Sequence, residues 1–338
     1  MSESVYTVSR GNLAENIIRA DIAVCDSEGN LIKSVGDSQK VCYMRSCAKP
    51  IQALAVIESG AQSRFHFDNK ELAIFCASHN AEPQQLQAVE SVLRKLGLKE
   101  DNLLCGKAVP YAGRQKEIYK AGDFAPRALV NNCSGKHAGL LASCIANKWR
   151  ITDYFLPSHP VQKLVLDIIA DFCAIPKKQI ICGVDGCGVP VFAMPLANMA
   201  KGYAELLQPT RVKASRREAA AQICIALRKN PLFIAGTGEF DSLVNFHTNG
   251  KIIAKRGADG VFLAACADGP AVALKMESGS NYYAPFVMFE ALRQLGCLTK
   301  TQQNNLAAWG EKNNLNCRGE VVGTAKAEFT LRKVAKDV

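Results

Sequence analysis

Short apolar runs of strand length lie at both ends of the chain, whereas its middle carries longer runs with the spacing of helices. Near the N-terminus, residues 19–24 and 31–35 flank the polar segment 26–30, Asp-Ser-Glu-Gly-Asn, whose composition predicts a β-hairpin. Near the C-terminus, residues 261–267 and 271–276 flank the turn-forming tripeptide Asp-Gly-Pro. We therefore expect both ends of the chain to contribute strands to one sheet.

A third hairpin is predicted around Asn249-Gly250, because Asn-Gly is the strongest short signal for a two-residue hairpin turn. Residues 243–247 and 251–255 would be its two strands. This prediction places Lys255 at the end of an edge strand, directly before the small residues of the segment 257–260, Gly-Ala-Asp-Gly. Small residues at a strand end let a substrate lie against the backbone.

Helical periodicity dominates the segment between these strand regions. The clearest case is residues 83–96, where apolar residues recur every three to four positions until Gly97 ends the pattern. The other predicted helices are one that begins at Ser46 and ends near Gly60, and those at 138–146, 161–173, 214–229 and 283–295.

Strands at both ends and helices between them predict a mixed α/β fold. We expect an antiparallel sheet built from N- and C-terminal strands, flanked by helices, with an inserted helical lobe. The expected division of the single catalytic domain 1–338 is a sheet lobe at about 1–45 and 236–338, and a helical lobe at about 46–235. The catalytic cleft would lie between the two lobes.

Composition narrows the classes of function. The net charge is +10, but the 41 Lys and Arg residues are scattered and form no basic stripe interleaved with aromatic residues, which argues against nucleic-acid binding. No segment approaches the roughly 18 consecutive apolar residues of a membrane span, and the N-terminus lacks the pattern of a secretion signal. Fourteen cysteines without regular spacing favour the reducing cytoplasm. We expect a cytoplasmic protein that acts on a small molecule.

Three short motifs suggest serine chemistry. Ser46 is the only serine with a lysine three residues later, Lys49, so the two side chains share one face of a helix. Ser78-His79-Asn80 is the only S-x-N, and Lys255-Arg256-Gly257 is a K-x-G. This order is that of penicillin-binding proteins and serine β-lactamases. Each motif alone is weak, because a helix cap followed by a surface lysine explains the first equally well.

A lysine that acts as a general base needs a lowered pKa. The ordinary pKa of lysine is about 10.4, and a useful general base needs a pKa of roughly 7–8. A second ammonium about 4 Å away is sufficient at an effective dielectric constant near 20, and Lys255 is the candidate for it. Ser78 would relay protons between the lysines and the leaving amine. The backbone N–H groups of Ser46 and of Gly257 or Ala258 would stabilise the oxyanion.

A second group of residues suggests a metal. Cys133, in the run Cys-Ser-Gly-Lys, and Cys187 each lie in a glycine-containing turn, and two thiolates suit a soft tetrahedral ion such as zinc. Two alternatives remain open on spacing alone. The cysteines are two small buried residues among fourteen, or Cys182 and Cys187 form a redox pair.

Five longer blocks resemble the asparaginase II family of Rhizobium etli-type L-asparaginases, which is similar in fold to serine β-lactamases and glutaminases. The resemblance spans nearly the whole chain, although this sequence has Asp259 where the family often has Glu. The blocks are Arg-Ser-Cys-Ala-Lys-Pro at 45–50, Ala-Ser-His-Asn-Ala-Glu at 77–82, Asn-Asn-Cys-Ser-Gly-Lys-His at 131–137, Gly-Val-Asp-Gly-Cys-Gly at 183–188 and Lys-Arg-Gly-Ala-Asp-Gly at 255–260.

The resemblance implies two Ser–Lys pairs, Ser46 with Lys49 and Ser78 with Lys255, in a homodimer. It also implies one zinc ion per chain, held by Cys133, Lys136 and Cys187, that orients the substrate. We further expect a set of substrate-binding residues drawn from the same blocks. They are Arg45, Asn80, His137, Asp185, Gly257 and Ala258.

The leading hypothesis is an L-asparaginase, in which Ser46 attacks the side-chain amide of L-asparagine and water then frees L-aspartate. One alternative is a glutaminase or a β-lactamase-like amidohydrolase with the same chemistry. A different class is a non-catalytic protein that binds an amino acid or zinc. The second lysine argues against a binder, because binding alone has no need of it.

Overall fold

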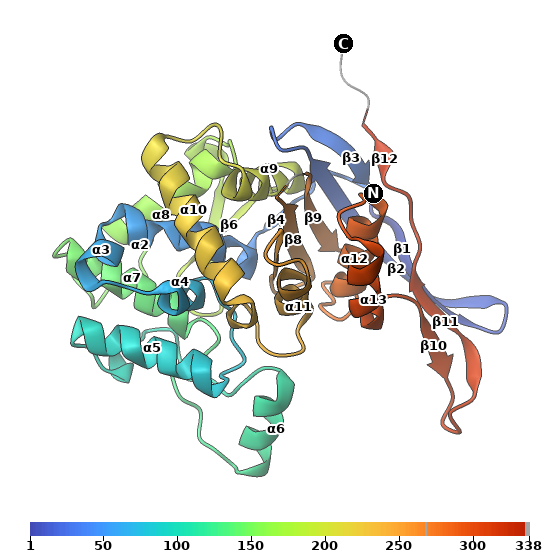
Figure 1. Cartoon of the computed structure of the whole chain (residues 1–338), viewed down its shortest axis with the longest axis horizontal. Coiled ribbons are helices and arrows are strands. Elements are labelled where there is room, and N and C mark those ends of the chain that lie inside the picture. The colour runs from blue at the N-terminus through green and yellow to red at the C-terminus, as the bar shows by residue number, and fades with distance from the viewer. Residues whose placement is uncertain (268, 335–338) are drawn as a thin grey trace.

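The computed structural model of this chain describes residues 1–267 and 269–334. A sheet at one side and a helical lobe at the other form an elongated molecule (Figure 1). The nine-stranded sheet follows the order β10-β11-β1-β2-β9-β8-β7, with β3 paired to β2 and β12 paired to β3, and all its pairs are antiparallel. Its strands are β1 (Glu3–Arg10), β2 (Leu13–Cys25), β3 (Leu31–Val35), β7 (Ile252–Arg256), β8 (Val261–Cys266), β9 (Ala271–Met276), β10 (Lys312–Leu315), β11 (Val321–Ala327) and β12 (Arg332–Lys333).

This architecture confirms the predicted fold class, an antiparallel sheet made from both ends of the chain with helices inserted between them. The helices are α1 (Lys49–Gln52), α2 (Leu54–Glu58), α3 (Ala61–Phe65), α4 (Asn69–Phe75), α5 (Pro83–Leu96), α6 (Gly113–Ala121), α7 (Ser134–Ala146), α8 (Pro160–Phe172), α9 (Leu196–Leu207), α10 (Ala214–Lys229), α11 (Phe240–His247), α12 (Ala284–Gln294) and α13 (Lys300–Asn305). Short 3₁₀ turns are η1 (Arg45–Ala48), η2 (Glu100–Asn102), η3 (Lys177–Gln179), η4 (Pro231–Phe233) and η5 (Ala307–Trp309). In the part of the chain that is described, no helix has the length and apolarity of a membrane span.

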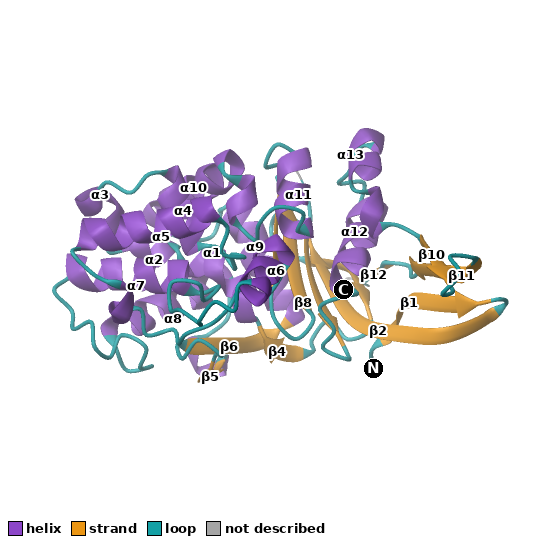
Figure 2. Cartoon of the chain, turned by 90° about the horizontal axis from the view of Figure 1, so that it is seen from below, coloured by secondary structure: helices purple, strands orange, loops and turns teal. Residues whose placement is uncertain are grey.

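The central strands are buried on both faces, which explains their continuous apolar sequence. In β8, Leu263 and Ala265 face the core shared with the helical lobe, where α9 packs against the sheet. Phe262 and Ala264 alternate with them and face a second core under α11 and α12. Figure 2 shows α12 standing on this second face. The period of two along a strand therefore divides one apolar run between two cores.

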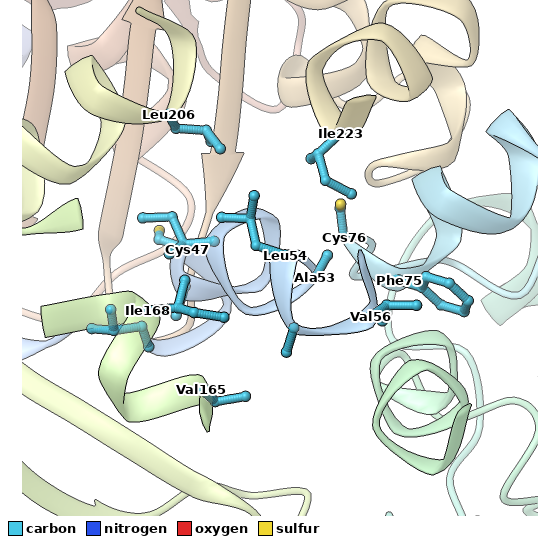
Figure 3. Packing of buried hydrophobic residues seen from close by; sticks show 14 of the residues in the cluster. Cys47, Ala53, Leu54, Val56, Phe75, Cys76, Val165, Ile168, Leu206 and Ile223 are labelled. Atoms are coloured by element: carbon cyan, nitrogen blue, oxygen red, sulfur yellow. The ribbon is translucent and has the colours of Figure 1, made fainter. Parts of the chain in front are cut away.

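The helical lobe packs around the short helices that follow the first strands. Leu54 and Val56 of α2 are buried in the same core as Val165 of α8, Leu206 of α9 and Ile223 of α10 (Figure 3). Full burial of a side chain of this size contributes about 1.5–3 kcal/mol, so the core fixes the position of α1 and of η1 before it.

A small second sheet connects the two lobes. It consists of β4 (Val41–Tyr43), β5 (Ile181–Val184) and β6 (Pro190–Pro195) in the order β4-β6-β5. β4 lies directly before η1, and the turn between β5 and β6 contains Asp185 and Cys187. This sheet therefore sets the position of that turn relative to Ser46.

Two of the three predicted hairpins are confirmed, and the third is wrong. The β2–β3 and β8–β9 pairs form as expected, and Asp268 of the second turn lies outside the described residues. Residues 243–247, however, belong to α11. Asn249 and Gly250 have φ angles of 52° and 71°, and the Gly250 N–H donates to the Asn245 carbonyl at 2.8 Å. The left-handed backbone that suits a hairpin turn here ends a helix.

The helical run from Ser46 is also less regular than predicted. It divides into η1, α1 and α2, and Ser46 lies inside η1, whose first turn has no side-chain cap. Ser46 therefore has no capping role, which leaves its hydroxyl available for other contacts.

Two helices of the lobe, α7 and α4, approach each other closely at Gly135. A Cβ on Gly135 of α7 would lie 2.2 Å from the backbone carbonyl oxygen of Ile74 in α4. We expect Gly135→Ala to lower the melting temperature, because overpacking costs about 1–3 kcal/mol and outweighs the gain of about 1 kcal/mol from alanine in a helix. Calorimetry measures the effect. Gly186→Ala, where nothing lies within 4 Å of the added Cβ, is the control, and equal melting temperatures of the two variants would contradict the close approach.

Candidate active site

Two adjoining cavities lie where the end of the sheet meets the helical lobe. They have volumes of about 250 Å³ and 170 Å³ and share Ser46, Tyr111, Asn132 and Ala258 in their walls. The larger cavity is further lined by Arg45, Asp185 and the two cysteines of the predicted metal site, Cys133 and Cys187. The smaller one is further lined by Ser78, Arg256, Gly257 and Asn281. Ser46 therefore lies at the junction of the two cavities.

Arg45 fixes the entrance to η1. Its φ of 50° is left-handed, a backbone conformation that is uncommon for any residue other than glycine. The guanidinium donates to Asp185 at 3.0 Å and also pairs with Asp259. The two carboxylates come from the β5–β6 turn and from the turn after β7. Arg45, the residue before Ser46, therefore connects both turns to the start of η1.

Lys49 is buried and its ammonium contacts uncharged groups. Nζ lies 2.7 Å from the Ala77 carbonyl, 3.2 Å from the Asn132 carbonyl and 3.0 Å from Ser78 Oγ. The sequence predicted contact with Ser46, but among the described residues Ser46 Oγ makes no hydrogen bond, and the serine that contacts Lys49 is Ser78. In its neutral form Lys49 would donate to the two carbonyls and direct its lone pair at the Ser78 hydroxyl.

Lys255 is the second buried lysine, with no exposed surface. Its Nζ donates to the Arg256 carbonyl at 2.8 Å and lies 3.5 Å from Asp241 Oδ2. Burial lowers the pKa of Lys255 to about 8, Asp241 opposes the shift, and Lys49 adds to it. The charge of Lys49 is thus one cause of the shift in Lys255, but the larger cause is burial, which a calculation from charge alone does not include.

His79 holds the turn that carries Ser78. Its Nδ1 accepts from the Ala81 N–H at 3.1 Å, so the neutral ring carries its proton on Nε2, which donates to Ser134 Oγ at 2.8 Å. Ser134 donates in turn to the Leu129 carbonyl. Burial, with a smaller contribution from Lys49, lowers the pKa of His79 to about 3. The ring is therefore neutral at physiological pH and links the turn to α7.

The three residues of the predicted zinc site converge. Lys136 Nζ lies 2.9 Å from Cys187 Sγ, and Cys133 hydrogen-bonds Cys187. That bond lowers the pKa of Cys187 to about 5 despite burial, and Lys136 adds to the shift. Cys182, the partner in the alternative redox pair, is exposed on β5. Within residues 1–267 and 269–334, no three His, Cys, Asp or Glu side chains are arranged to hold a metal ion, so this site depends on its lysine.

The predicted substrate-binding residues divide into two groups. Arg45, Asp185, Gly257 and Ala258 line the two cavities. Asn80 instead lines a neighbouring cavity of about 300 Å³, and its Nδ2 donates to Glu239 at 3.0 Å. His137 is held at Nδ1 by the Tyr154 hydroxyl at 2.6 Å, and its buried Nε2 has no hydrogen-bond partner in the described structure.

Sequence reasoning missed four residues of the site. Tyr111 lies between the predicted helices 83–96 and 138–146, where no motif was identified, and its hydroxyl donates to the Ser78 carbonyl at 3.1 Å. Asn132 and Arg256 lie within the quoted blocks but received no role. Asp241, next to Lys255, was placed before a strand that proved to be a helix, so that nothing in the predicted order brought it to the site.

The chain is similar to one protein family and to several solved structures. The family model described as L-asparaginase II matches residues 6–327. Three similar solved structures are a β-lactamase from Mycobacterium bovis (13% identity, 82% of this chain and 94% of that chain, TM-score 0.41), a probable glutaminase (15%, 82% and 85%, 0.38) and the simvastatin synthase of Aspergillus terreus (11%, 81% and 93%, 0.39). No curated protein sequence matches the chain.

The neutral His79 predicts a specific dependence of stability on pH. Its pKa is about 3 in the folded state and about 6.5 when unfolded, so the unfolded state binds one more proton between these values. The free energy of unfolding should therefore fall as the pH drops from 6.5 towards 3, with a total contribution from His79 of about 4–5 kcal/mol. Urea unfolding from pH 7 to pH 4 should show a shallower fall for His79→Gln. His66→Gln at an exposed position is the control, and an unchanged slope in His79→Gln would contradict the buried neutral ring.

Proposed function

The chain belongs to the L-asparaginase II family, and we propose on this basis that it hydrolyses L-asparagine to L-aspartate and ammonia with Ser46 as nucleophile. Membership of the family makes the protein a hydrolase that acts on amides. The observation that carries the finer assignment is the position of Ser46, at the junction of two cavities. Two buried lysines lie beside the smaller cavity: Lys49 contacts Ser78 of its wall, and Lys255 precedes Arg256 of its wall.

The proposed reaction uses the groups around Ser46 in order. Ser46 Oγ would attack the side-chain amide carbon, and its proton would pass to Lys49 by way of Ser78, which shares the wall of the smaller cavity with Ser46 and hydrogen-bonds Lys49. Ser78 relays the proton to the departing nitrogen, which leaves as ammonia, and water then cleaves the acyl-serine ester by the reverse transfers. Lys255, below the same site, supports this relay through its charge.

The oxyanion would be stabilised by backbone N–H groups. The Gly257 N–H already donates to the Val261 carbonyl at 2.7 Å, which leaves Ala258 as the donor from the strand end. The second donor is the N–H of Ser46 itself, near the start of η1. Two such donors directed at one oxygen are worth several kcal/mol in the transition state.

Charged groups of the larger cavity suit an amino acid that is a zwitterion. In this proposal Arg45 binds the α-carboxylate and Asp185 the α-ammonium group, both of them wall residues of the cavity. His137 lines neither cavity, so a role for its unpartnered Nε2 in substrate binding would require the wall of the cavity to move. The volume of about 250 Å³ suits a substrate of the size of a single amino acid.

Zinc fits the donor set of Cys133, Lys136 and Cys187, because two sulfur atoms and one nitrogen already contact one another. Burial lowers the pKa of Lys136, but the neighbouring thiols and Asp185 outweigh it and raise the pKa, so metal binding must release the proton of Lys136. A bound zinc ion would supply a Lewis-acidic point that orients the α-amino or carboxylate group of the substrate. We extend the proposal to a homodimer in the cytoplasm, which the family resemblance and the fourteen free thiols support.

Replacement of the nucleophile tests the function directly. Ser46→Ala should reduce ammonia release from asparagine by roughly a thousandfold or more, because the covalent step is lost while the helix turn is kept. Ser63→Ala, an exposed serine on α3, is the matched control. Assays with asparagine, glutamine and a penicillin side by side separate the three amidohydrolase hypotheses. Substantial activity of Ser46→Ala would remove Ser46 as nucleophile, and no turnover of any amide by the unmodified protein would favour a binding protein.

Metal analysis tests the zinc site. Protein purified without chelator should contain one zinc per chain, and Cys187→Ser should lose it, whereas Cys182→Ser at an exposed position should keep it. Since the Ser–Lys groups supply the nucleophile, removal of the metal should raise KM more than it lowers kcat. Zinc-free protein would refute the site. A complete loss of kcat on chelation, restored by zinc, would instead give the metal the leading chemical role.

A further inference from the structure

Asp241 is a buried carboxylate that the proposed reaction has not used. It lies in the first turn of α11 and has no exposed surface. Its Oδ2 accepts from the Arg256 N–H at 3.1 Å and lies 3.5 Å from Lys255 Nζ. Its Oδ1 has no hydrogen-bond partner among the described residues, although Arg256 Nε is 3.8 Å away. A buried charge with incomplete hydrogen bonding is costly, so its retention requires a reason.

Arg256 is not a sufficient reason, because it has its own counter-ion. Its guanidinium pairs with Glu239 and lies over the ring of Tyr111. Lys255, in contrast, has Asp241 as its only carboxylate within 4 Å in the described part of the chain. Asp241 is therefore shared between the two adjacent cations, but Arg256 has a second carboxylate and Lys255 has none within 4 Å in the described part of the chain.

The two lysines of the site differ in this respect. Lys49 is surrounded by two carbonyls and a hydroxyl, and no carboxylate of the described residues lies within 4 Å of it. Lys255 has both a carbonyl and a carboxylate. A negative charge at this distance favours the charged form of an amine. Asp241 is therefore a local reason for Lys255 to hold its proton.

We propose that Asp241 is a positioning residue, which holds the side chain of Lys255 and favours its charged form in this site. The proposal rests on the function given above, since Lys255 is one of the two lysines of that site. It requires no additional ligand. Asp241 lines neither cavity, and the charged groups that it contacts are Lys255 and Arg256, of which Arg256 lines the smaller cavity.

The charges that surround the pair determine the sign of the effect. Lys255 is faced by Lys49 from α1, Arg256 from β7 and Cys47 from η1, and Asp241 is faced in addition by Tyr111 and Tyr203. Burial, Lys49 and Arg256 lower the pKa of Lys255, whereas Asp241 raises it. Neutralising Asp241 must therefore lower the pKa of Lys255 further, whether Lys255 acts as an acid or as a base.

The experiment is the pH profile of kcat/KM for Asp241→Asn. The limb that belongs to Lys255 is first identified as the one that disappears in Lys255→Met. In Asp241→Asn this limb should move to lower pH by about one unit or more, and Asp241→Glu should move it most of the way back. Asp21→Asn, which neutralises an equally buried carboxylate in β2 whose partners are Ser2, Asp37 and Lys40, should leave the limb in place. A folded Asp241→Asn variant with an unmoved limb would overturn the proposal.

A thermal double-mutant cycle tests the same pair without activity. Asp241→Asn leaves the buried ammonium of Lys255 unpaired, so it should lower the melting temperature more in the unmodified protein than in Lys255→Met. This measurement also covers the case in which Asp241→Asn alone fails to fold, because the double variant should then regain a folded state. Equal effects in both backgrounds would overturn the pairing. If the unmodified protein releases no ammonia from asparagine, the proposed function fails, and the cycle still decides whether Asp241 holds Lys255.

Discussion

Two lysine side chains buried in one site are the constraint on which the rest of the structure depends. An ammonium group removed from water loses several kcal/mol of hydration, and two of them repel each other in addition. Lys49 and Lys255 are tolerated because carbonyl oxygens from two turns and from the end of β7, and one carboxylate, are directed at them. Each of those segments has to be held in place by its own packing. The site is therefore a product of the whole fold and not of one loop.

The sheet supplies that rigidity. β8 divides its apolar side chains between two cores. Its neighbour β7 packs against α11 and contacts η1. This arrangement places Lys255, near the C-terminal end of β7, against η1, which follows β4 of the small sheet. Cys47, the residue after Ser46, and Lys255 are 208 residues apart in the sequence, and Cys47 Sγ lies 3.0 Å from the Lys255 carbonyl oxygen.

The outcome for the sequence analysis follows a physical rule. Hairpins such as β2–β3 and the motifs around Ser46 and Ser78 were predicted, because local spacing carries the signal. Asn249-Gly250 misled, since left-handed backbone ends a helix as well as it turns a hairpin. The contact of Lys49 with Ser78, and the presence of Asp241, depend on which turns meet across the core. No local pattern encodes such meetings, and a long side chain such as lysine can reach several partners.

Arg45 has a consequence for how any anionic ligand enters the site. Its guanidinium is already engaged by Asp185 and Asp259, so an incoming carboxylate has to exchange with one of them. Asp259 is the cheaper one to release, because its side chain is 68% exposed, whereas that of Asp185 is 11% exposed. Such an exchange replaces one ion pair of Arg45 with another, so the number of ion pairs that Arg45 makes is unchanged. Ligand affinity should consequently depend little on ionic strength, and arrival of the ligand would untie the turn after β7 from the entrance of η1.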